Sequence, residues 1–73
     1  MAATEILSEV IGSVWKIEKA QGDSVAKGEL IMILESMKME IPVEAPVAGT
    51  LSEIKVAPED SVDEDQVLCL IES

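Results

Sequence analysis

Lys38 is the residue of this chain best placed to do chemistry. It stands between Met37 and Met39 in the stretch LIMILESMKMEIPVEAP, residues 30–46, where strand-like apolar runs flank it on both sides. Two flexible apolar side chains at an exposed position reduce solubility and favour contact with a partner. The lysine therefore has two interpretations: a functional amine that a partner reaches, or an ordinary solvated residue at a hairpin tip.

The other side chains offer little for catalysis. The chain has no histidine and one cysteine, Cys69, so neither a zinc site nor an internal disulfide is expected. Cys69 lies in the apolar run VLCLI and is interpreted as a small core residue rather than a reactive thiol. The Asp and Glu residues are interpreted as a solvated surface. We therefore expect a protein that is not an enzyme, with no catalytic residue and no metal site.

Composition predicts one small domain. Of the 73 residues, 48% are hydrophobic and 1% are aromatic, so Val, Ile, Leu and Met are expected to pack around Trp15. The formal net charge of −10 argues against binding to nucleic acid or to an anionic membrane surface. No stretch approaches the ~18 apolar residues of a membrane span, and a lone cysteine agrees with a cytoplasmic location.

The chain contains an internal duplication. GSVWKIEKAQGDSVAKGELIMILES, residues 12–36, aligns without a gap with GTLSEIKVAPEDSVDEDQVLCLIES, residues 49–73. The identical pairs are Gly12/Gly49, Ile17/Ile54, Ala20/Ala57, Asp23/Asp60, Ser24/Ser61, Val25/Val62, Glu35/Glu72 and Ser36/Ser73. Two copies are too few for a solenoid, so we expect the halves to pack on each other, with pseudo-two-fold symmetry, in a single domain of residues 1–73.

Each copy predicts a strand, a turn and a second strand. GDSVAKG, residues 22–28, is a turn signal between the apolar runs VWKI and LIMIL, and the second copy repeats this order. Residues 39–45 alternate with the period of a half-buried strand. Residues 29–41 also fit a helical stripe, but Pro42 and the short second copy favour strands. We predict an all-β fold, a small antiparallel sandwich or flattened barrel, and leave open whether residues 2–5 begin the first strand.

The segment 37–48 links the two copies and is interpreted as a unique insert. If LIMIL, residues 30–34, runs one way and MEIPVEA, residues 39–45, returns beside it, the chain reverses at Met37-Lys38. A two-residue hairpin prefers Asn-Gly or Asp-Gly because both central residues often need a positive φ, and Met-Lys is a poor choice there. A local rule broken without visible compensation indicates strain or function.

The motif ESMKME, residues 35–40, resembles the attachment motif Glu-Ala/Ser-Met-Lys-Met of biotinyl domains in the biotin carboxyl carrier family. The similarity extends over residues 5–72 and includes the Gly-Asp before the lysine and the Ala-Pro and Gly after it. The resemblance implies a flattened barrel of two antiparallel sheets, with the lysine on a tight hairpin at the end opposite the termini. It also implies that a biotin protein ligase transfers biotin from biotinyl-adenylate to the ε-amine of Lys38, forming an amide.

The same resemblance implies a carrier function. Covalent biotin on Lys38 would take up carboxylate at a biotin carboxylase site and deliver it at a carboxyltransferase site, where an acyl-CoA or keto acid accepts it. Met37 and Met39 match the family's pair and are expected to contact the ligase or the carboxylase, whereas Glu35 and Glu40 are interpreted as solubilising strand-end residues. The domain on its own is expected to be a monomer.

The chain departs from the family pattern in the turns of its second half. The family usually has glycine in the turns of both halves, but Gly22 and Gly28 here align with Glu59 and Asp65, so the second-half turns are expected to be built differently.

Lipoyl domains share the fold, with a lysine that typically follows Asp. A lipoyl carrier, a dual biotin and lipoate acceptor, and an interaction module with an unmodified lysine therefore remain alternatives.

Overall fold

Strands account for all the helix and strand structure in residues 3–73, the part of the chain that the computed structural model describes. They are β1 (Ala3–Leu7), β2 (Gly12–Ile17), β3 (Ser24–Val25), β4 (Leu30–Ser36), β5 (Met39–Glu44), β6 (Gly49–Ile54), β7 (Ser61–Val62) and β8 (Val67–Glu72). The predicted all-β fold is confirmed, and the stretch that also fitted a helix forms β4 and β5. Residues 3–5 belong to the first strand, while residue 2 lies outside the described part. No helix in that part is long and apolar enough to cross a membrane.

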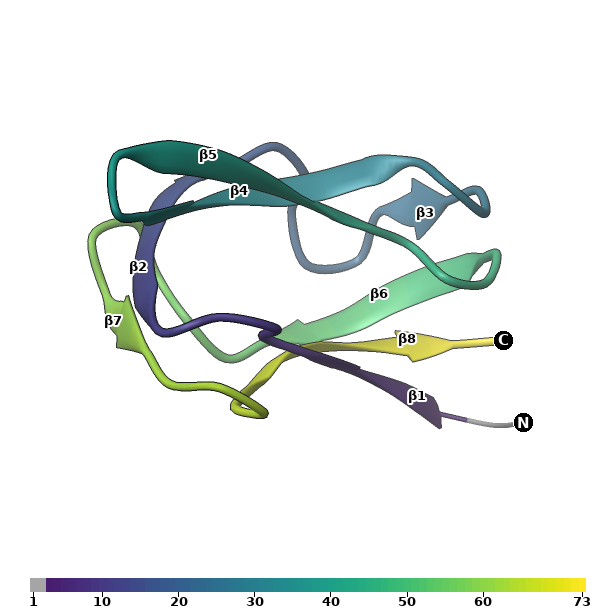
Figure 1. Cartoon of the computed structure of the whole chain (residues 1–73). Helices are drawn as coiled ribbons and strands as arrows, with labels where there is room; N and C mark the ends of the chain where they lie inside the picture. Colours follow the sequence, from purple (N-terminus) through teal and green to yellow (C-terminus); the bar gives the residue numbers. More distant parts are fainter. Residues whose placement is uncertain (1–2) are drawn as a thin grey trace.

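The strands form two antiparallel sheets that face each other (Figure 1). One sheet has the order β1-β8-β6-β3 and the other has the order β5-β4-β2-β7. The short strands are exchanged between the halves, because β3 pairs with β6 and β7 pairs with β2. Neither half completes its sheet alone, so the two copies interlock into one flattened barrel.

The duplication extends beyond the repeats visible in the sequence. β1 lies beside β8 as β5 lies beside β4, and a shift of 37 residues converts one register into the other, since Ile6↔Cys69 corresponds to Val43↔Met32. Most of the segment interpreted as a unique insert therefore has a structural counterpart. Only the turn of residues 37–38 is added between the copies.

The core is aliphatic and comes from both sheets. Its buried hydrophobic side chains are Ile6, Val14, Val25, Ile31, Met32, Leu34, Ala45, Leu51, Val56, Val62, Leu68, Cys69 and Ile71. Cys69 is fully buried, as predicted, and burial raises the pKa of its thiol to about 11. The prediction of a core around Trp15 is wrong, because this side chain is 44% exposed. It lies at a bulge in β2, where the Lys16 ammonium is 5.0 Å from the ring centroid.

The turns of the two copies are built alike. Gly22 and Gly28 have φ angles of 97° and 85°, and their counterparts Glu59 and Asp65 have φ angles of 74° and 66°. The Glu59 N–H donates to the Val14 carbonyl oxygen at 2.7 Å, and the equivalent bond of the first half has the same length. The expectation that the second-half turns differ is therefore wrong, since the same hydrogen bonds hold the left-handed conformation without glycine.

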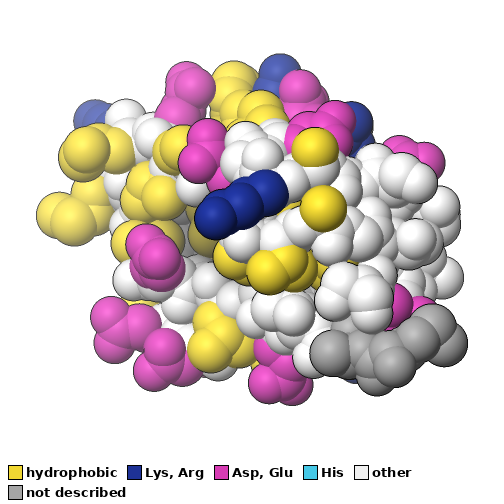
Figure 2. Space-filling view, turned by 90° about the vertical axis from the view of Figure 1, so that its right-hand side faces the viewer, with side chains coloured by type: hydrophobic (Ala, Val, Ile, Leu, Met, Phe, Trp, Pro, Cys, Tyr) yellow, Lys and Arg dark blue, Asp and Glu magenta, His cyan; other side chains and the backbone are white. Residues whose placement is uncertain are grey.

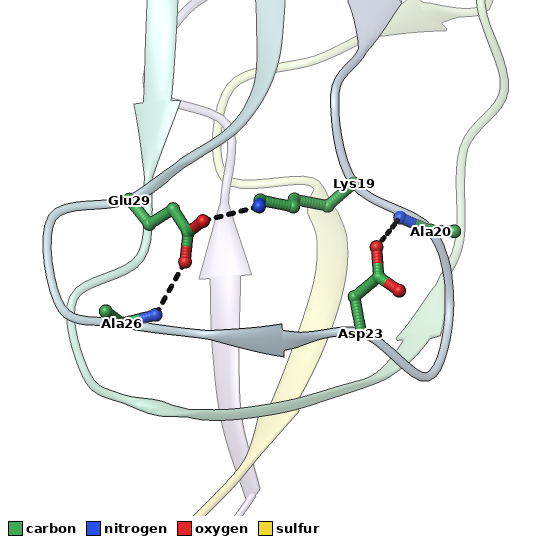
Figure 3. A network of polar contacts seen from close by, with 5 residues as sticks. All are labelled: Lys19, Ala20, Asp23, Ala26 and Glu29. Atoms are coloured by element: carbon green, nitrogen blue, oxygen red, sulfur yellow. Dashed lines mark hydrogen bonds and ion pairs between the residues drawn. The ribbon is translucent and has the colours of Figure 1, made fainter.

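Hydrogen bonds from backbone N–H groups to side-chain oxygen atoms also stabilise these turns (Figure 3). The Asp23 carboxylate accepts from the Ala20 N–H at 2.9 Å, and the Glu29 carboxylate accepts from the Ala26 N–H at 2.8 Å. Lys19 forms an ion pair with Glu29, and this hydrogen-bonded contact raises the pKa of the lysine and lowers the pKa of the carboxyl. The second half repeats both side-chain-to-backbone bonds at 2.9 Å. The turns of both halves are therefore held by the same set of hydrogen bonds between side chains and backbone.

Candidate modification site

Lys38 lies on a two-residue turn between β4 and β5. The two strands pair as far as Ser36↔Met39, so Met37 and Lys38 alone connect them. Their φ angles of 52° and 66° are both left-handed, as the favoured two-residue hairpin turn requires. The predicted reversal is confirmed. Each of these two residues costs about 1–2 kcal/mol in this conformation because its Cβ crowds the backbone.

The turn projects into solvent. Met37 is 92% exposed, Met39 is 66% exposed, and Lys38 is exposed between them. In Figure 1 the turn lies at the left end of the molecule, whereas β1 begins and β8 ends at the right. The expected position opposite the termini is therefore confirmed. A macromolecular partner can approach this primary amine without any rearrangement of the fold.

The base of the turn is held in place by the neighbouring strand. The Ser36 hydroxyl donates to the Ile11 carbonyl oxygen at 2.8 Å. At the next position, β2 and β4 approach so closely that a Cβ on Gly12 would clash with the Glu35 carbonyl oxygen. Glycine is required at this position for that reason, and the turn stands on a fixed base.

Two carboxylates flank the turn. Glu35 and Glu40 lie directly opposite each other on β4 and β5, and both are exposed. Like charges at opposite positions of an antiparallel pair destabilise it. Neither residue forms an ion pair within residues 3–73. Their solubilising role stays a prediction, and their pairing concentrates negative charge beneath the lysine.

A groove separates the edge strands β1 and β5 and does not include the turn. Its volume is about 570 Å³, and its lining includes the buried Ile6 and Leu34 with the exposed carboxylates of Glu5 and Glu9. Across the described residues, no group of His, Cys, Asp and Glu side chains could hold a metal ion. The groove therefore lies apart from the exposed amine of Lys38.

Sequence reasoning missed one residue at this site, Ile11. Its side chain is 69% exposed, and its carbonyl oxygen accepts a hydrogen bond from the hydroxyl of Ser36, which lies 25 residues further along the chain. The signal that could have found it is the comparison of the two copies, because the aligned residue in the second copy is Ala48.

Comparison with known proteins finds relatives over the whole domain. A family model described as "Biotin-requiring enzyme" matches residues 2–71. The chain is 38% identical over 69 residues to the biotinylated protein TB7.3 homolog of Mycobacterium leprae, covering 94% of this chain and 97% of that protein. It is 43% identical over 60 residues to the biotin/lipoyl attachment protein of Bacillus subtilis, covering 82% of each.

A solved structure shows the same fold inside a much larger protein. The chain superposes on part of the Kluyveromyces lactis urea carboxylase with a TM-score of 0.92 and 32% identity. The match covers 99% of this chain and 6% of that chain. A domain of this kind thus occurs within a carboxylase.

Proposed function

Because the chain belongs to the family of biotin and lipoyl attachment domains, we propose that it carries biotin on Lys38 and moves carboxylate between the biotin carboxylase and carboxyltransferase sites of a biotin-dependent carboxylase. The observation that carries this proposal is the left-handed Met37-Lys38 turn, which holds one exposed amine at the tip of a hairpin. The domain supplies position, and the catalytic groups belong to its partners.

The residues at the tip fit covalent attachment. Lys38 is exposed and takes part in none of the ion pairs of the described residues. Its unprotonated Nζ attacks the acyl carbon of biotinyl-adenylate, so that an amide bond forms and AMP leaves with the electron pair of the broken acyl–phosphate bond. Two protons leave the ammonium in all, one before the attack and one as the amide forms. The product has a net charge of −11, because one positive charge is lost from a chain of charge −10.

Residues of this chain set the position of the attached group. Biotin supplies the capacity to carry carboxylate when it is bound. The turn fixes the Cα of Lys38 relative to the barrel, and the bond between Ser36 and Ile11 fixes the base of the turn. Met37 and Met39 present apolar surface that the ligase or the carboxylase contacts. Position and access come from the fold, while reach comes from the long lysine side chain.

A lipoyl carrier, or an acceptor of both biotin and lipoate, is the second candidate. The observation that favours it is the similarity to the Bacillus subtilis protein, whose name includes both groups. Met37 argues for biotin, because lipoyl domains typically have Asp at the position directly before the lysine.

Intact mass spectrometry separates these candidates. The chain is co-expressed with an active biotin protein ligase, and separately with a lipoate ligase, and Lys38→Arg serves as the control that keeps the charge. We expect wild type to gain one biotinyl group and Lys38→Arg to gain none. A lipoyl adduct without a biotinyl adduct supports the second candidate. No adduct with either active ligase overturns the carrier function and leaves an unmodified interaction module.

We also propose that the isolated domain is a monomer and that it acts in the cytoplasm. Both sheets bury their apolar faces within one chain, so folding needs no second copy. The lone Cys69 is a thiol, as a reducing compartment favours. Size-exclusion chromatography with light scattering should give the mass of one chain, 7.8 kDa, and a dimer mass contradicts the first part of this proposal.

A further inference from the structure

The fold is symmetric, but its exposed apolar surface is not. Ile11 and Ala48 occupy equivalent positions, each directly before a glycine that packs against a backbone carbonyl of the neighbouring strand. Both residues are exposed. Since the same backbone environment accepts alanine in one half, packing does not require the larger side chain of isoleucine in the other.

Ile11 lies beside the attachment turn. β2 and β4 pair with Ser13 opposite Glu35, and two further steps of this antiparallel register place Ile11 opposite Met37. The hydrogen bond from the Ser36 hydroxyl to the Ile11 carbonyl, 2.8 Å long, agrees with this placement. Ile11, which directly precedes β2, thus borders a turn that lies more than 25 residues further along the chain.

The most exposed large hydrophobic residues of the described chain all border Lys38. Met37 is 92% exposed, Ile11 is 69% exposed and Met39 is 66% exposed, and the next values fall to 44% and 42%. We call these three residues the apolar collar. The opposite end, shown in Figure 2, also carries hydrophobic side chains, but there they are interspersed with acidic side chains and a basic side chain. Single exposed apolar residues are ordinary, but a group of them around one functional side chain marks a contact surface.

We infer that the apolar collar is a docking surface for the biotin protein ligase that acylates Lys38, and that Ile11 is a recognition residue outside the ESMKME motif; this rests on the proposed function. An enzyme that delivers an acyl-adenylate to the Lys38 amine must close over the tip, so its surface also covers Ile11. Burial of the collar removes apolar area from water and favours the complex. Recognition then needs the folded pair of β2 and β4 and not the linear motif alone.

The two copies supply matched variants for the test. Ile11→Ala gives position 11 the residue that the fold already accepts at position 48, and Ala48→Ile makes the reverse change at the opposite end. Steady-state biotin transfer by a biotin protein ligase is measured for wild type and both variants. We expect Ile11→Ala to raise KM about tenfold and to change kcat less than about twofold, because three carbon atoms are lost from the buried surface. Ala48→Ile should leave both constants unchanged.

Each outcome of this comparison decides the inference. An unchanged KM for Ile11→Ala overturns it while leaving biotin attachment in place. An equal rise in KM for both variants also overturns it, because the effect then does not depend on the turn. A peptide of residues 30–46 that is acylated as efficiently as the folded chain excludes a role for Ile11. Absence of transfer to wild type overturns the proposed function and this inference together. Thermal unfolding of all three chains confirms that each is folded.

Discussion

Replacing Met37 with glycine should stabilise the domain and weaken biotin transfer to Lys38. Met37 has a φ of 52°, a left-handed conformation that costs a non-glycine residue about 1–2 kcal/mol. Glycine avoids this cost but loses about 0.5–1 kcal/mol more conformational entropy on folding. The difference favours glycine by about 0.5–1 kcal/mol. Little packing opposes this gain, because the Met37 side chain is 92% exposed.

A gain of this size is measurable in so small a domain. About 1 kcal/mol corresponds to about 4–8 °C in Tm for a domain of 60–100 residues, so a gain of about 0.5–1 kcal/mol in Met37→Gly should raise Tm by about 2–8 °C. The same substitution removes the most exposed member of the apolar collar, so KM for biotin transfer should rise about tenfold. Stability and transfer efficiency are therefore expected to change in opposite senses.

Glu59→Gly is the matched control. Glu59 has a φ of 74° and its counterpart in the first half is Gly22, so the same relief of strain is expected. Glu59 belongs to the connection between β6 and β7 and not to the β4–β5 hairpin, so transfer kinetics are expected not to change. Calorimetry and ligase assays on both variants complete the comparison. A lower Tm for both glycine variants refutes the strain argument. An unchanged KM for Met37→Gly refutes the role of the Met37 side chain in binding the ligase.

Other predictions concern the frame that holds the turn. Gly12→Ala should lower stability to urea by about 2 kcal/mol or more, because the new Cβ clashes with the Glu35 carbonyl oxygen, and an unchanged unfolding midpoint contradicts this. The hydrogen bond from Lys19 lowers the pKa of Glu29, so this contact stabilises the fold above the unfolded-state pKa and is lost as the pH falls through the folded-state pKa. Glu29→Gln should therefore weaken the pH dependence of acid unfolding, and identical acid profiles for the two proteins argue against the contact. Burial raises the pKa of the Cys69 thiol to about 11, so a thiol reagent at about pH 8 should label only unfolded chain, and rapid labelling of native protein contradicts that burial.

Much of the fold could be predicted because its signals are local. Alternating side chains in residues 39–45 and the gapless repeat indicated strands and a pseudo-two-fold domain. The exchange of β3 and β7 between the halves could not be predicted, since two-residue strands carry no periodicity and their pairing is long-range. β1 and β5 share a place in their sheets without sharing residue identity, so the full extent of the duplication appears only in the register.

The site divides in the same way. Lys38 and its two methionines follow from a contiguous motif, whereas Ile11 joins them only through strand pairing. Trp15 was misplaced because the composition offered no other aromatic residue for the core, while the strand alternation after the buried Val14 turns it outward. The left-handed Glu59 was unexpected, because the hydrogen bond that holds it runs from its N–H to the carbonyl oxygen of Val14, 45 residues earlier, and such a long-range bond leaves no local signal in the sequence.

The central claim is that the fold selects one amine among several chemically similar ones. Peptide mapping by tandem mass spectrometry, after exposure of the folded chain to biotin protein ligase, biotin and ATP, tests this directly. We predict biotin on Lys38 and on none of the other lysines, Lys16, Lys19, Lys27 and Lys55. Biotin on any of those four with Lys38 unmodified would contradict the claim.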